Sequence, residues 1–274
     1  MTTALAAQEL VARRRAGRTG ERLAEKVRPS NLEQALAIQA AVTELLCADE
    51  KDTIGAWKAG LPSGKNPDKP DRLVVAPIFA SSVQTAATVS LFPSGASAAS
   101  AGVARVEPEF AFFLARDLPA RKRPYSAVEI RAAVGSVHMA LELVGGRYSK
   151  PADCTFSDKL ADSLENQGLL IGPSVVREHA FNASELTLTL TTKSGTQTLK
   201  GKHPAGDPAA PLYWLAEFLR SRGEGLRRGQ AVVTGCYSEQ VLELPFDQPI
   251  SVGYTSADGK HQFGQIDVQF KSRG

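Results

Sequence analysis

The run Val103-Ala-Arg-Val-Glu-Pro-Glu-Phe-Ala-Phe-Phe-Leu114 decides the fold of this chain. Two carboxylates interrupt a segment that is otherwise suited to burial. A β-strand advances about 3.3 Å per residue and alternates its faces, so Arg105, Glu107 and Glu109 are predicted to share one side. The apolar and aromatic residues between them then share the other side. The pattern predicts a strand with an acidic face and an apolar face.

Two acids on a semi-buried wall repel each other, and burying them is costly unless a cation pairs with them. A third carboxylate, Glu142, stands alone in the apolar run Met139-Ala-Leu-Glu-Leu-Val-Gly145. Carboxylate oxygens are the ligands that hard cations such as Mg²⁺ and Mn²⁺ prefer. The residues alone leave two interpretations open. Glu107, Glu109 and Glu142 form a metal site, or the strand faces the surface and its glutamates pair with Arg105 or with lysines.

Composition indicates a globular protein with enough apolar residues for a core, 43% of 274. The net charge of +3, from 32 basic and 29 acidic residues, does not indicate a nucleic-acid partner. Three widely spaced cysteines without a CxxC pair predict neither disulfides nor structural zinc, and favour the reducing cytoplasm. We expect neither a secretory signal nor a membrane span of roughly 18 apolar residues.

A basic cluster lies near the start of the chain and consists of Arg13, Arg14, Arg15, Arg18 and Arg22. Two interpretations stay open for it. It is a solvated helix face, or it is a contact for an anion or for another subunit.

Helical spacing of apolar residues predicts helices over residues 4–16 and 32–47, and Ser126 begins a capping box that predicts a third. A fourth helix is expected between Asp207 and Gly223. Most other segments read as short strands: residues 53–61, 73–79, 88–92, 103–114, the Glu142 segment, 186–190, 230–234, 250–255 and 262–270.

No alternating βαβ pattern occurs, so the predicted fold class is α+β, strand-dominated, with a mixed sheet and helices outside it. Residues 1–50 are expected to form a helical N-terminal arm. Residues 51–274 are expected to form the catalytic core, with the whole chain as one domain overall.

Several common catalytic motifs are missing from the sequence. It contains no GxSxG nucleophile elbow, no complete phosphate loop and no dinucleotide fingerprint. The four histidines are not spaced as metal ligands and are interpreted as structural or exposed. These observations argue against a serine hydrolase, a nucleotide-binding enzyme and a histidine-ligated metal site.

A set of short motifs occurs in order along nearly the whole chain: Gly55-Ala-Trp-Lys-Ala-Gly-Leu61, Pro77-Ile-Phe79, Val106-Glu-Pro-Glu-Phe110, Ala140-Leu-Glu-Leu-Val144, Leu160-Ala-Asp162, His203-Pro204, Trp214-Leu-Ala216 and Val233-Thr-Gly235. With these motifs the chain resembles the fumarylacetoacetate hydrolase superfamily, most of all its 2-keto-4-pentenoate hydratase and 4-oxalocrotonate decarboxylase branch. The resemblance implies a mixed β-roll or barrel-like core wrapped by helices, a Mg²⁺ or Mn²⁺ site, and a homo-oligomer.

The same resemblance implies roles for individual residues. The metal ligands would be Glu107, Glu109 and Glu142, the catalytic lysine would be Lys58, and the substrate would contact Lys58, Asp162 and Thr234. A 2-oxo or 2-hydroxydienoic acid can chelate such a metal through its carboxylate and C2 oxygen, so that positive charge stabilises the enolate. Lys58 would supply a second positive charge or a proton.

The chain departs from the hydratase pattern at two places. Relatives carry a Pro-Asp-Phe-Gly-like segment where this chain reads Leu73-Val-Val-Ala-Pro-Ile-Phe79, without the acid. In Ala161-Asp-Ser-Leu-Glu165, Glu165 stands where a small serine is expected. Glu165 either supplies a catalytic base, pairs with a cationic group of the substrate, or points away from the site.

The leading hypothesis is a metal-dependent lyase of the 2-keto-4-pentenoate hydratase kind, acting on small 2-oxo or 2-hydroxydienoic acids in aromatic-compound catabolism. The alternatives are a 4-oxalocrotonate decarboxylase-like enzyme, an acylpyruvate C–C hydrolase, and a non-catalytic homologue that binds an oxo acid or partners a hydratase or decarboxylase subunit. Expected partners are a small oxo acid and further copies of the chain. Neither nucleic acid nor a membrane is expected.

Overall fold

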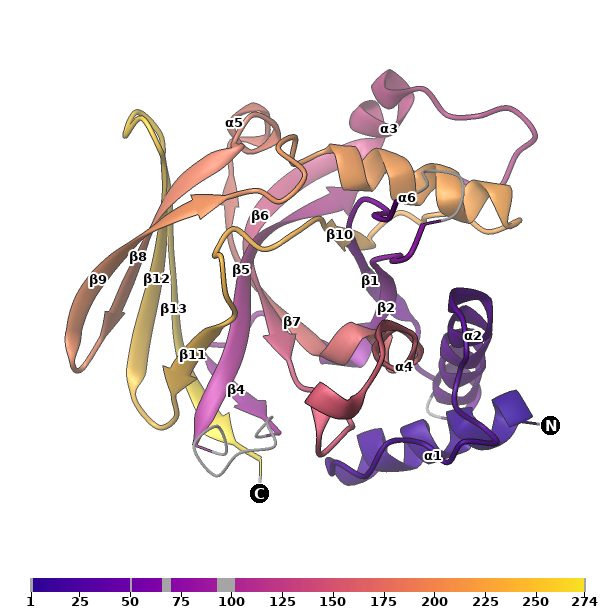
Figure 1. Ribbon diagram of the computed structural model, residues 1–274. Coiled ribbons are helices and arrows are strands. Elements are labelled where there is room, and N and C mark those ends of the chain that lie inside the picture. The colour runs from indigo at the N-terminus through magenta and orange to yellow at the C-terminus, as the bar shows by residue number, and fades with distance from the viewer. Residues whose placement is uncertain (1, 50, 66–69, 93–101, 274) are drawn as a thin grey trace.

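The computed structural model describes residues 2–49, 51–65, 70–92 and 102–273, and it contains two β-sheets with the N-terminal helices on the far side of the first sheet from the second (Figure 1). The helices are α1 (Thr2–Ala16), α2 (Leu32–Asp49), α3 (Ala127–Ala133), α4 (Phe156–Ala161), α5 (Arg177–Phe181) and α6 (Ala210–Ser221), with short 3₁₀ turns at Ala80–Ser82, Pro151–Asp153 and Ser163–Glu165. Within these residues no helix combines the length and the apolar character needed to cross a bilayer.

The strands divide into two sheets. The first contains β1 (Ile54–Ala59), β2 (Val75–Phe79), β3 (Val83–Gln84), β5 (Val103–Leu114), β6 (Val134–Val144), β7 (Asn166–Val175), β10 (Ala231–Val233) and β11 (Leu242–Pro245). The second contains β4 (Thr88–Leu91), β8 (Glu185–Thr192), β9 (Gly195–Lys202), β12 (Pro249–Ser256) and β13 (Gln262–Ser272).

The first sheet curls into a nearly closed barrel. Its strand order is β2-β1-β10-β5-β6-β7-β3, with β11 paired to the outer part of β5. Strand β2 lies against β7, so the two ends of the sheet approach each other. Most pairs are antiparallel, but β1 runs parallel to β10 and β3 runs parallel to β7. The expectation of a strand-dominated α+β fold with a mixed, barrel-like sheet is confirmed.

The second sheet packs on the outside of this barrel through a group of aromatic rings. Phe110, on the apolar face of β5, is 1% exposed. Its ring meets those of Tyr237 and Tyr254 at 5.6 Å and that of Phe263 at 5.1 Å, all edge to face. Such pairs add to the stabilisation that comes from burying apolar area. Phe110 therefore joins the two sheets.

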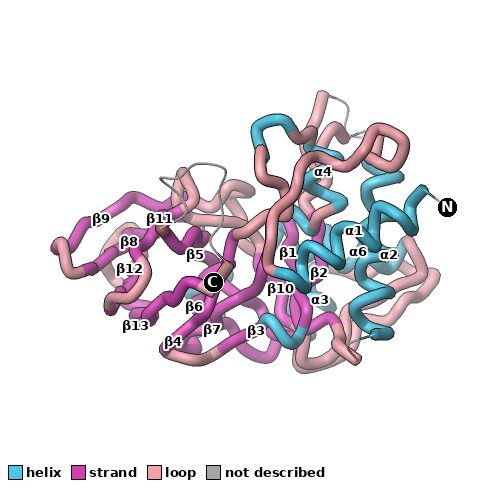
Figure 2. The backbone as a smooth tube through the Cα atoms, turned by 90° about the horizontal axis from the view of Figure 1, so that it is seen from below, coloured by secondary structure: helices cyan, strands magenta, loops and turns pink. Residues whose placement is uncertain are grey.

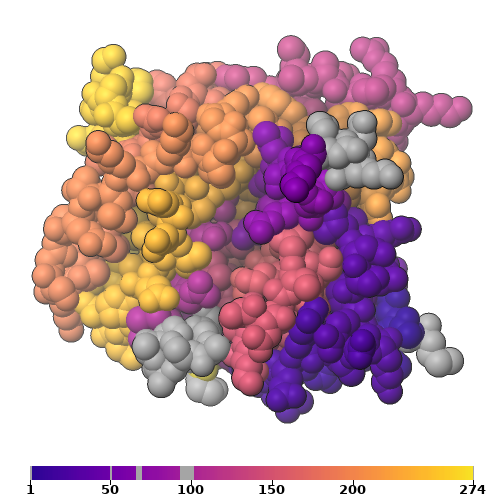
Figure 3. All heavy atoms as spheres, viewed as in Figure 1, coloured from indigo at the N-terminus to yellow at the C-terminus, as the bar shows by residue number. Residues whose placement is uncertain are grey.

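The N-terminal helices pack against the barrel on the side away from the second sheet, as the view from below shows (Figure 2). Helix α1 contacts α2, and α2 contacts α4. Gln39 of α2 is buried and donates to the carbonyl oxygens of Val75 at 3.1 Å and Leu160 at 2.7 Å. On the face drawn in Figure 3, the segment around α4 adjoins these helices. The division of the chain at residue 50 stays a prediction.

Local signals in the sequence agree with the observed elements. The helices expected over residues 4–16 and 32–47 are α1 and α2, and Asn31 caps α2 by accepting from the amide of Gln34 at 2.9 Å. Ser126 and Glu129 form the predicted capping box of α3. Strands β8 and β9 form a hairpin around Lys193 and Ser194, as expected. Capping and turn chemistry depend on neighbouring residues, so they can be read locally.

Removing the Phe110 ring should weaken the contact between the sheets. We expect Phe110→Ala to lower the free energy of unfolding by about 3–5 kcal/mol, because it deletes a buried ring and leaves a cavity. Urea denaturation followed by circular dichroism measures this loss. Val128→Ala is the control, since Val128 is 77% exposed. A loss for Phe110→Ala no larger than that of the control would contradict the role of Phe110.

Candidate metal centre

Four charged side chains project into the barrel near one end. In the register of β5 and β6, Glu107 lies opposite Glu142 and Glu109 lies opposite Ala140. Lys58 comes from β1, which is separated from β5 by β10. Deeper in the barrel the interior is filled by apolar, mostly small residues: Ala56, Ile78, Ala111, Ala140, Leu169, Ile171, Ala231 and Val233. The alternation of β5 therefore directs its acids inward and Phe110 toward the second sheet, in agreement with the predicted opposite faces.

Lys58 lies between two of the acids. Its Nζ is 3.1 Å from Oε2 of Glu107 and 2.9 Å from Oε1 of Glu142. Carboxylate oxygens of Glu107, Glu109 and Glu142 all lie within 4.8 Å of one another. Glu109 and Glu142 are buried, whereas the side chains of Lys58 and Glu107 keep 16% and 18% of their surface exposed. The surface-strand interpretation is wrong, because these carboxylates face the barrel interior.

A backbone amide holds Glu109 in place. The N–H of Gly235 donates to Oε2 of Glu109 at 2.7 Å. Gly235 has φ of 141°, and a Cβ at this position would lie 2.7 Å from Pro204. Only glycine fits such a conformation at such a close approach. The Thr-Gly pair of the sequence motif thus supplies a donor to the carboxylate.

Asn166, the first residue of β7, supports Glu142. Its Nδ2 donates to Oε1 of Glu142 at 3.0 Å. The three preceding residues, Ser163, Leu164 and Glu165, have φ between 52° and 64°, a left-handed conformation that costs about 1–2 kcal/mol per residue when the residue is not glycine. The turn redirects the chain from α4 into β7, so that Asn166 reaches the interior acid.

Burial and neighbouring charges shift the pKa values of three residues in the site. Burial raises the pKa of Glu109 well above its ordinary value, and the nearby charges of Glu142 and Glu107 raise it further. Burial also raises the pKa of Glu142, although Lys58 opposes this shift. For Lys58, burial alone would lower the pKa, but the three carboxylates outweigh it and raise the pKa. One lysine therefore faces three acids.

The donor set fits a hard divalent cation. Oε1 of Glu109 and Oε2 of Glu142 are buried and have no hydrogen-bond partner among the described residues. A buried carboxylate oxygen without a partner is costly, and a cation is the partner that three converging acids favour. Glu107, Glu109 and Glu142 are the residues that would hold the metal ion.

Two residues expected to contact the substrate are bonded elsewhere. Thr234 is buried next to Gly235, with its Oγ1 3.4 Å from Nε2 of His203. Asp162 is 3% exposed, and both of its carboxylate oxygens accept from Arg147, one from Nε at 2.5 Å and one from the backbone N–H at 2.8 Å. Thr234 lies beside the amide that bonds Glu109, whereas the Asp162 carboxylate is engaged in a buried ion pair.

Glu165 lies on the left-handed turn before β7. Its Oε2 is 3.3 Å from Nζ of Lys159, and its side chain is 22% exposed. Its backbone carbonyl accepts from the N–H of Gly145 at 2.6 Å, which ties the end of β6 to the start of β7. The contacts of the Glu165 carboxylate do not include Lys58 or the three acids. Glu165 thus precedes Asn166 directly in the sequence, but its carboxylate pairs with Lys159.

Sequence reasoning missed Asn166 and treated His203 as structural. Asn166 follows directly after the Ala161–Glu165 stretch that departs from the family pattern, so that departure was the signal for this region. His203 is 1% exposed, and burial lowers its pKa to about 4, with Asp207 opposing the shift. The ring of His203 is therefore neutral near pH 7.

No family model matches the chain. Among curated proteins it is similar to 2-keto-4-pentenoate hydratase from Paraburkholderia xenovorans (strain LB400), with 28% identity over 144 residues, 52% of each protein. The same enzyme from Paraburkholderia phymatum is 30% identical over 141 residues, 50% of this chain and 52% of that protein. The chain thus spans about half the length of the curated relatives it matches. The resemblance expected from the motifs is confirmed.

Solved structures resemble this chain over more of its length than the sequence matches do. The 4-oxalocrotonate decarboxylase of Pseudomonas putida G7, complexed with magnesium and adipate, superposes with a TM-score of 0.72 at 14% identity, over 98% of this chain and 97% of that one. A protein from Yersinia pestis CO92 assigned to the fumarylacetoacetate hydrolase family gives a TM-score of 0.51 at 15% identity, over 80% of this chain and 94% of that one. The chain has the fumarylacetoacetate hydrolase fold. At these identities the likeness concerns the fold.

Replacing Glu109 by glutamine should stabilise the protein when no metal is present. A carboxyl group whose pKa is raised by folding is best tolerated when protonated, so it costs stability increasingly as pH rises from its ordinary pKa through its raised one. We expect Glu109→Gln to raise the free energy of unfolding by about 1–2 kcal/mol at pH 8, and by less at pH 5.

Chemical denaturation at the two pH values, in the presence of a chelator, measures this difference. The control is Glu243→Gln, which removes an acid that is 54% exposed and paired with Arg105. An equal gain in the free energy of unfolding at both pH values, or a loss at pH 8, would show that the ionised Glu109 carboxylate does not destabilise the folded protein.

Proposed function

We propose that this protein is a metal-dependent lyase that acts on a small 2-oxo or 2-hydroxydienoic acid, in the manner of a 2-keto-4-pentenoate hydratase. The observation that carries the proposal is Lys58 held among three inward carboxylates, two of which keep a buried oxygen without a partner among the described residues. The curated relatives are named for this hydration, and the matched decarboxylase binds magnesium together with a dicarboxylate.

The metal ion would be Mg²⁺ or Mn²⁺, held by Glu107, Glu109 and Glu142. Both ions take oxygen ligands and keep positions open for a substrate. Once bound, the ion would supply positive charge to the substrate's carboxylate and C2 oxygen. Two of the three ligands are buried, so the open positions would lie on the side of Lys58 and Glu107, the partly exposed pair.

Lys58 would act on the charge that develops during the reaction. Its raised pKa keeps Nζ protonated near neutral pH, so it can donate a hydrogen bond to an oxygen that becomes negative as the dienol turns into the enone. One water molecule then adds across the conjugated double bond, with hydroxyl on one carbon and a proton on the next. Because Nζ is already held by Glu107 and Glu142, little reorganisation is needed.

Three further residues complete the proposed site. Thr234 would contact the substrate beside the Gly235 amide. Asp162 would do so only if its pair with Arg147 opened, because that pair engages both of its oxygens. Glu165 would serve as the base, a role that its partly exposed side chain and its place next to Asn166 support. The chain would work in the cytoplasm as a homo-oligomer, in keeping with its three free cysteines and with the family resemblance.

A 4-oxalocrotonate decarboxylase-like activity is the second candidate. The observation in its favour is the fold, because the structure of that enzyme matches 98% of the chain with a TM-score of 0.72. The same electron sink that stabilises an enolate would accept the electrons released with CO₂. The substrate that turns over distinguishes the two reactions.

Metal and lysine should both be required for turnover. With Mn²⁺, the protein is expected to consume 2-hydroxypenta-2,4-dienoate, which is followed by the loss of its ultraviolet absorbance. Lys58→Met should lower kcat/KM by about 10²–10³, the usual effect of losing one donor to a developing oxyanion. The control is Lys202→Met, whose lysine is 77% exposed. Release of CO₂ from 4-oxalocrotonate without hydration of the dienoate would favour the second candidate.

Metal binding is tested separately from catalysis. Mn²⁺ should raise the melting temperature of the wild-type protein, because it binds only the folded state, and Glu107→Ala should abolish the rise. A melting temperature that does not respond to Mn²⁺, together with no turnover of either acid, would sink the proposal and leave the non-catalytic alternative.

The role of Glu165 has its own test. Glu165→Gln should lower kcat about 10²-fold and remove the acidic limb of the pH–rate profile, because glutamine cannot accept a proton. Glu178→Gln provides a matched control on a solvent-facing glutamate of α5 that pairs with Arg177. An unchanged pH profile for Glu165→Gln would assign the base to another group.

A further inference from the structure

A cavity lies outside the barrel, where the end of α1 meets the edge of the first sheet. Its volume is about 780 Å³, within the range of small-molecule sites. Among the described residues, six arginines and one acid, Asp52, line it. We call it the arginine pocket and define it by these six residues: Arg13, Arg14, Arg15, Arg18, Arg147 and Arg273. It shares no lining residue with the candidate metal centre.

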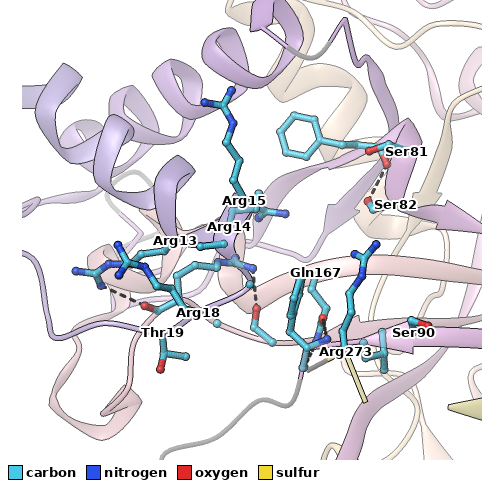
Figure 4. Close-up of a pocket in the computed structure, with 18 of the residues that line it drawn as sticks. Arg13, Arg14, Arg15, Arg18, Thr19, Ser81, Ser82, Ser90, Gln167 and Arg273 are labelled. Carbon is cyan, nitrogen blue, oxygen red and sulfur yellow. Dashed lines mark hydrogen bonds between the residues drawn. The ribbon is translucent and has the colours of Figure 1, made fainter. Parts of the chain in front are cut away.

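The arginines come from two sides of the pocket. Arg13, Arg14, Arg15 and Arg18 belong to the end of α1 and the turn after it, while Arg273 follows β13 and lies beside Gln167 and Ser90 (Figure 4). An arginine presents a planar fork of donors that matches phosphate and carboxylate oxygens. Positive charge on two walls suits a ligand with an anionic group at each end.

Part of this charge is not neutralised by the protein. The side chain of Arg13 pairs with Glu9, and that of Arg15 with Asp49. Arg18 and Arg273, by contrast, have no carboxylate partner within the described part of the chain.

Other groups offset only part of the positive charge in the pocket. Asp52 contributes one negative charge, and its oxygens accept from the amide and the hydroxyl of Ser81 at 3.1 and 2.5 Å rather than from an arginine. The Arg273 guanidinium lies 5.2 Å from the centre of the Phe92 ring, a contact that leaves its charge uncompensated. The pocket therefore carries a net positive potential, in a protein whose overall charge is only +3.

The back of the pocket is rigid. Arg147 is 5% exposed, and its Nη1 donates to the carbonyl oxygens of Gly145 and Asn166 at 2.7 and 2.8 Å. Arg14 donates to the same carbonyl oxygen of Asn166 at 3.2 Å. A preorganised wall reduces the ordering cost of binding. Arg18 and Arg273, which are both exposed, are the two groups proposed to close on a ligand in front of this wall.

We propose that the arginine pocket binds a small polyanion with phosphate or carboxylate groups at two ends, and that Arg18 and Arg273 hold these two groups. This interpretation extends one of the two expected for the N-terminal basic cluster, a contact for an anion. The site is separate from the proposed reaction, because its lining includes neither Lys58 nor any of the three acids of the metal centre.

Isothermal titration of the full chain with inorganic pyrophosphate tests the proposal, with no divalent cation added and with ionic strength held constant by NaCl. A parallel titration with citrate separates phosphate from carboxylate ligands. Saturable binding of at least one of them is expected. The double variant Arg18→Ala/Arg273→Ala should weaken it by about tenfold or more, since two charge-assisted contacts are lost.

The matched control is Arg123→Ala/Arg228→Ala, which removes the same charge from exposed arginines outside the pocket. Equal weakening by the control variant would show a general charge effect and overturn the proposal. So would the absence of saturable binding of both anions. If binding is absent and Arg18→Ala/Arg273→Ala changes the molar mass measured by light scattering, the pocket is a contact between copies of the chain instead. Thermal melts confirm that each variant is folded.

Discussion

The hydrogen-bonded contact of Lys58 with Glu107 and Glu142 is the constraint on which the rest of the structure depends. Three carboxylates inside a barrel repel one another, and desolvation makes Glu109 and Glu142 costly to ionise. Their burial requires the register that sets Glu107 opposite Glu142 and brings β1 close enough for Lys58 to reach both. A slip of one residue in β5 would turn the acids toward the second sheet and Phe110 into the barrel.

The small residues of the barrel interior explain why the charges gather at one end. Ala56, Ala111, Ala140 and Ala231 occupy neighbouring strands deeper in the barrel, so the sheet can curl tightly there. These apolar residues offer no ionisable side chain, so the chemistry is expected at the end where Lys58 and Glu107 remain partly exposed. Solvent exposure therefore differs across the site. Glu109 and Glu142 are buried, whereas Lys58 and Glu107 are partly exposed.

The sequence pattern predicted the parts of the site that depend on strand alternation. The spacing of Glu107 and Glu109 fixed a shared face, and the isolated Glu142 indicated a second interior acid. What pairs with them could not be read from alternation, because β1 and β10 pair in parallel across a long separation in sequence. The Gly235 donor depends on a close approach to Pro204, which is a property of the folded chain.

The position of Asn166 could not be predicted from local sequence rules, because it depends on the unusual backbone of the three residues before it. Nothing in Ser163-Leu-Glu165 predicts three left-handed residues, since none is glycine or asparagine. Tertiary contacts impose the turn: Asp162 before it is fixed by Arg147, and the Glu165 carbonyl after it accepts from Gly145.

The turn positions Asn166 so that its side chain and its carbonyl bond to two different sites. The side chain of Asn166 bonds Glu142 inside the barrel, while its carbonyl accepts from Arg14 and Arg147 at the back of the arginine pocket. A strained turn is retained where the surrounding contacts overdetermine it, and such turns concentrate at functional positions. One residue therefore contacts both the candidate metal centre and the arginine pocket. The strain before β7 is thus the structural feature that joins the inner site to the outer one.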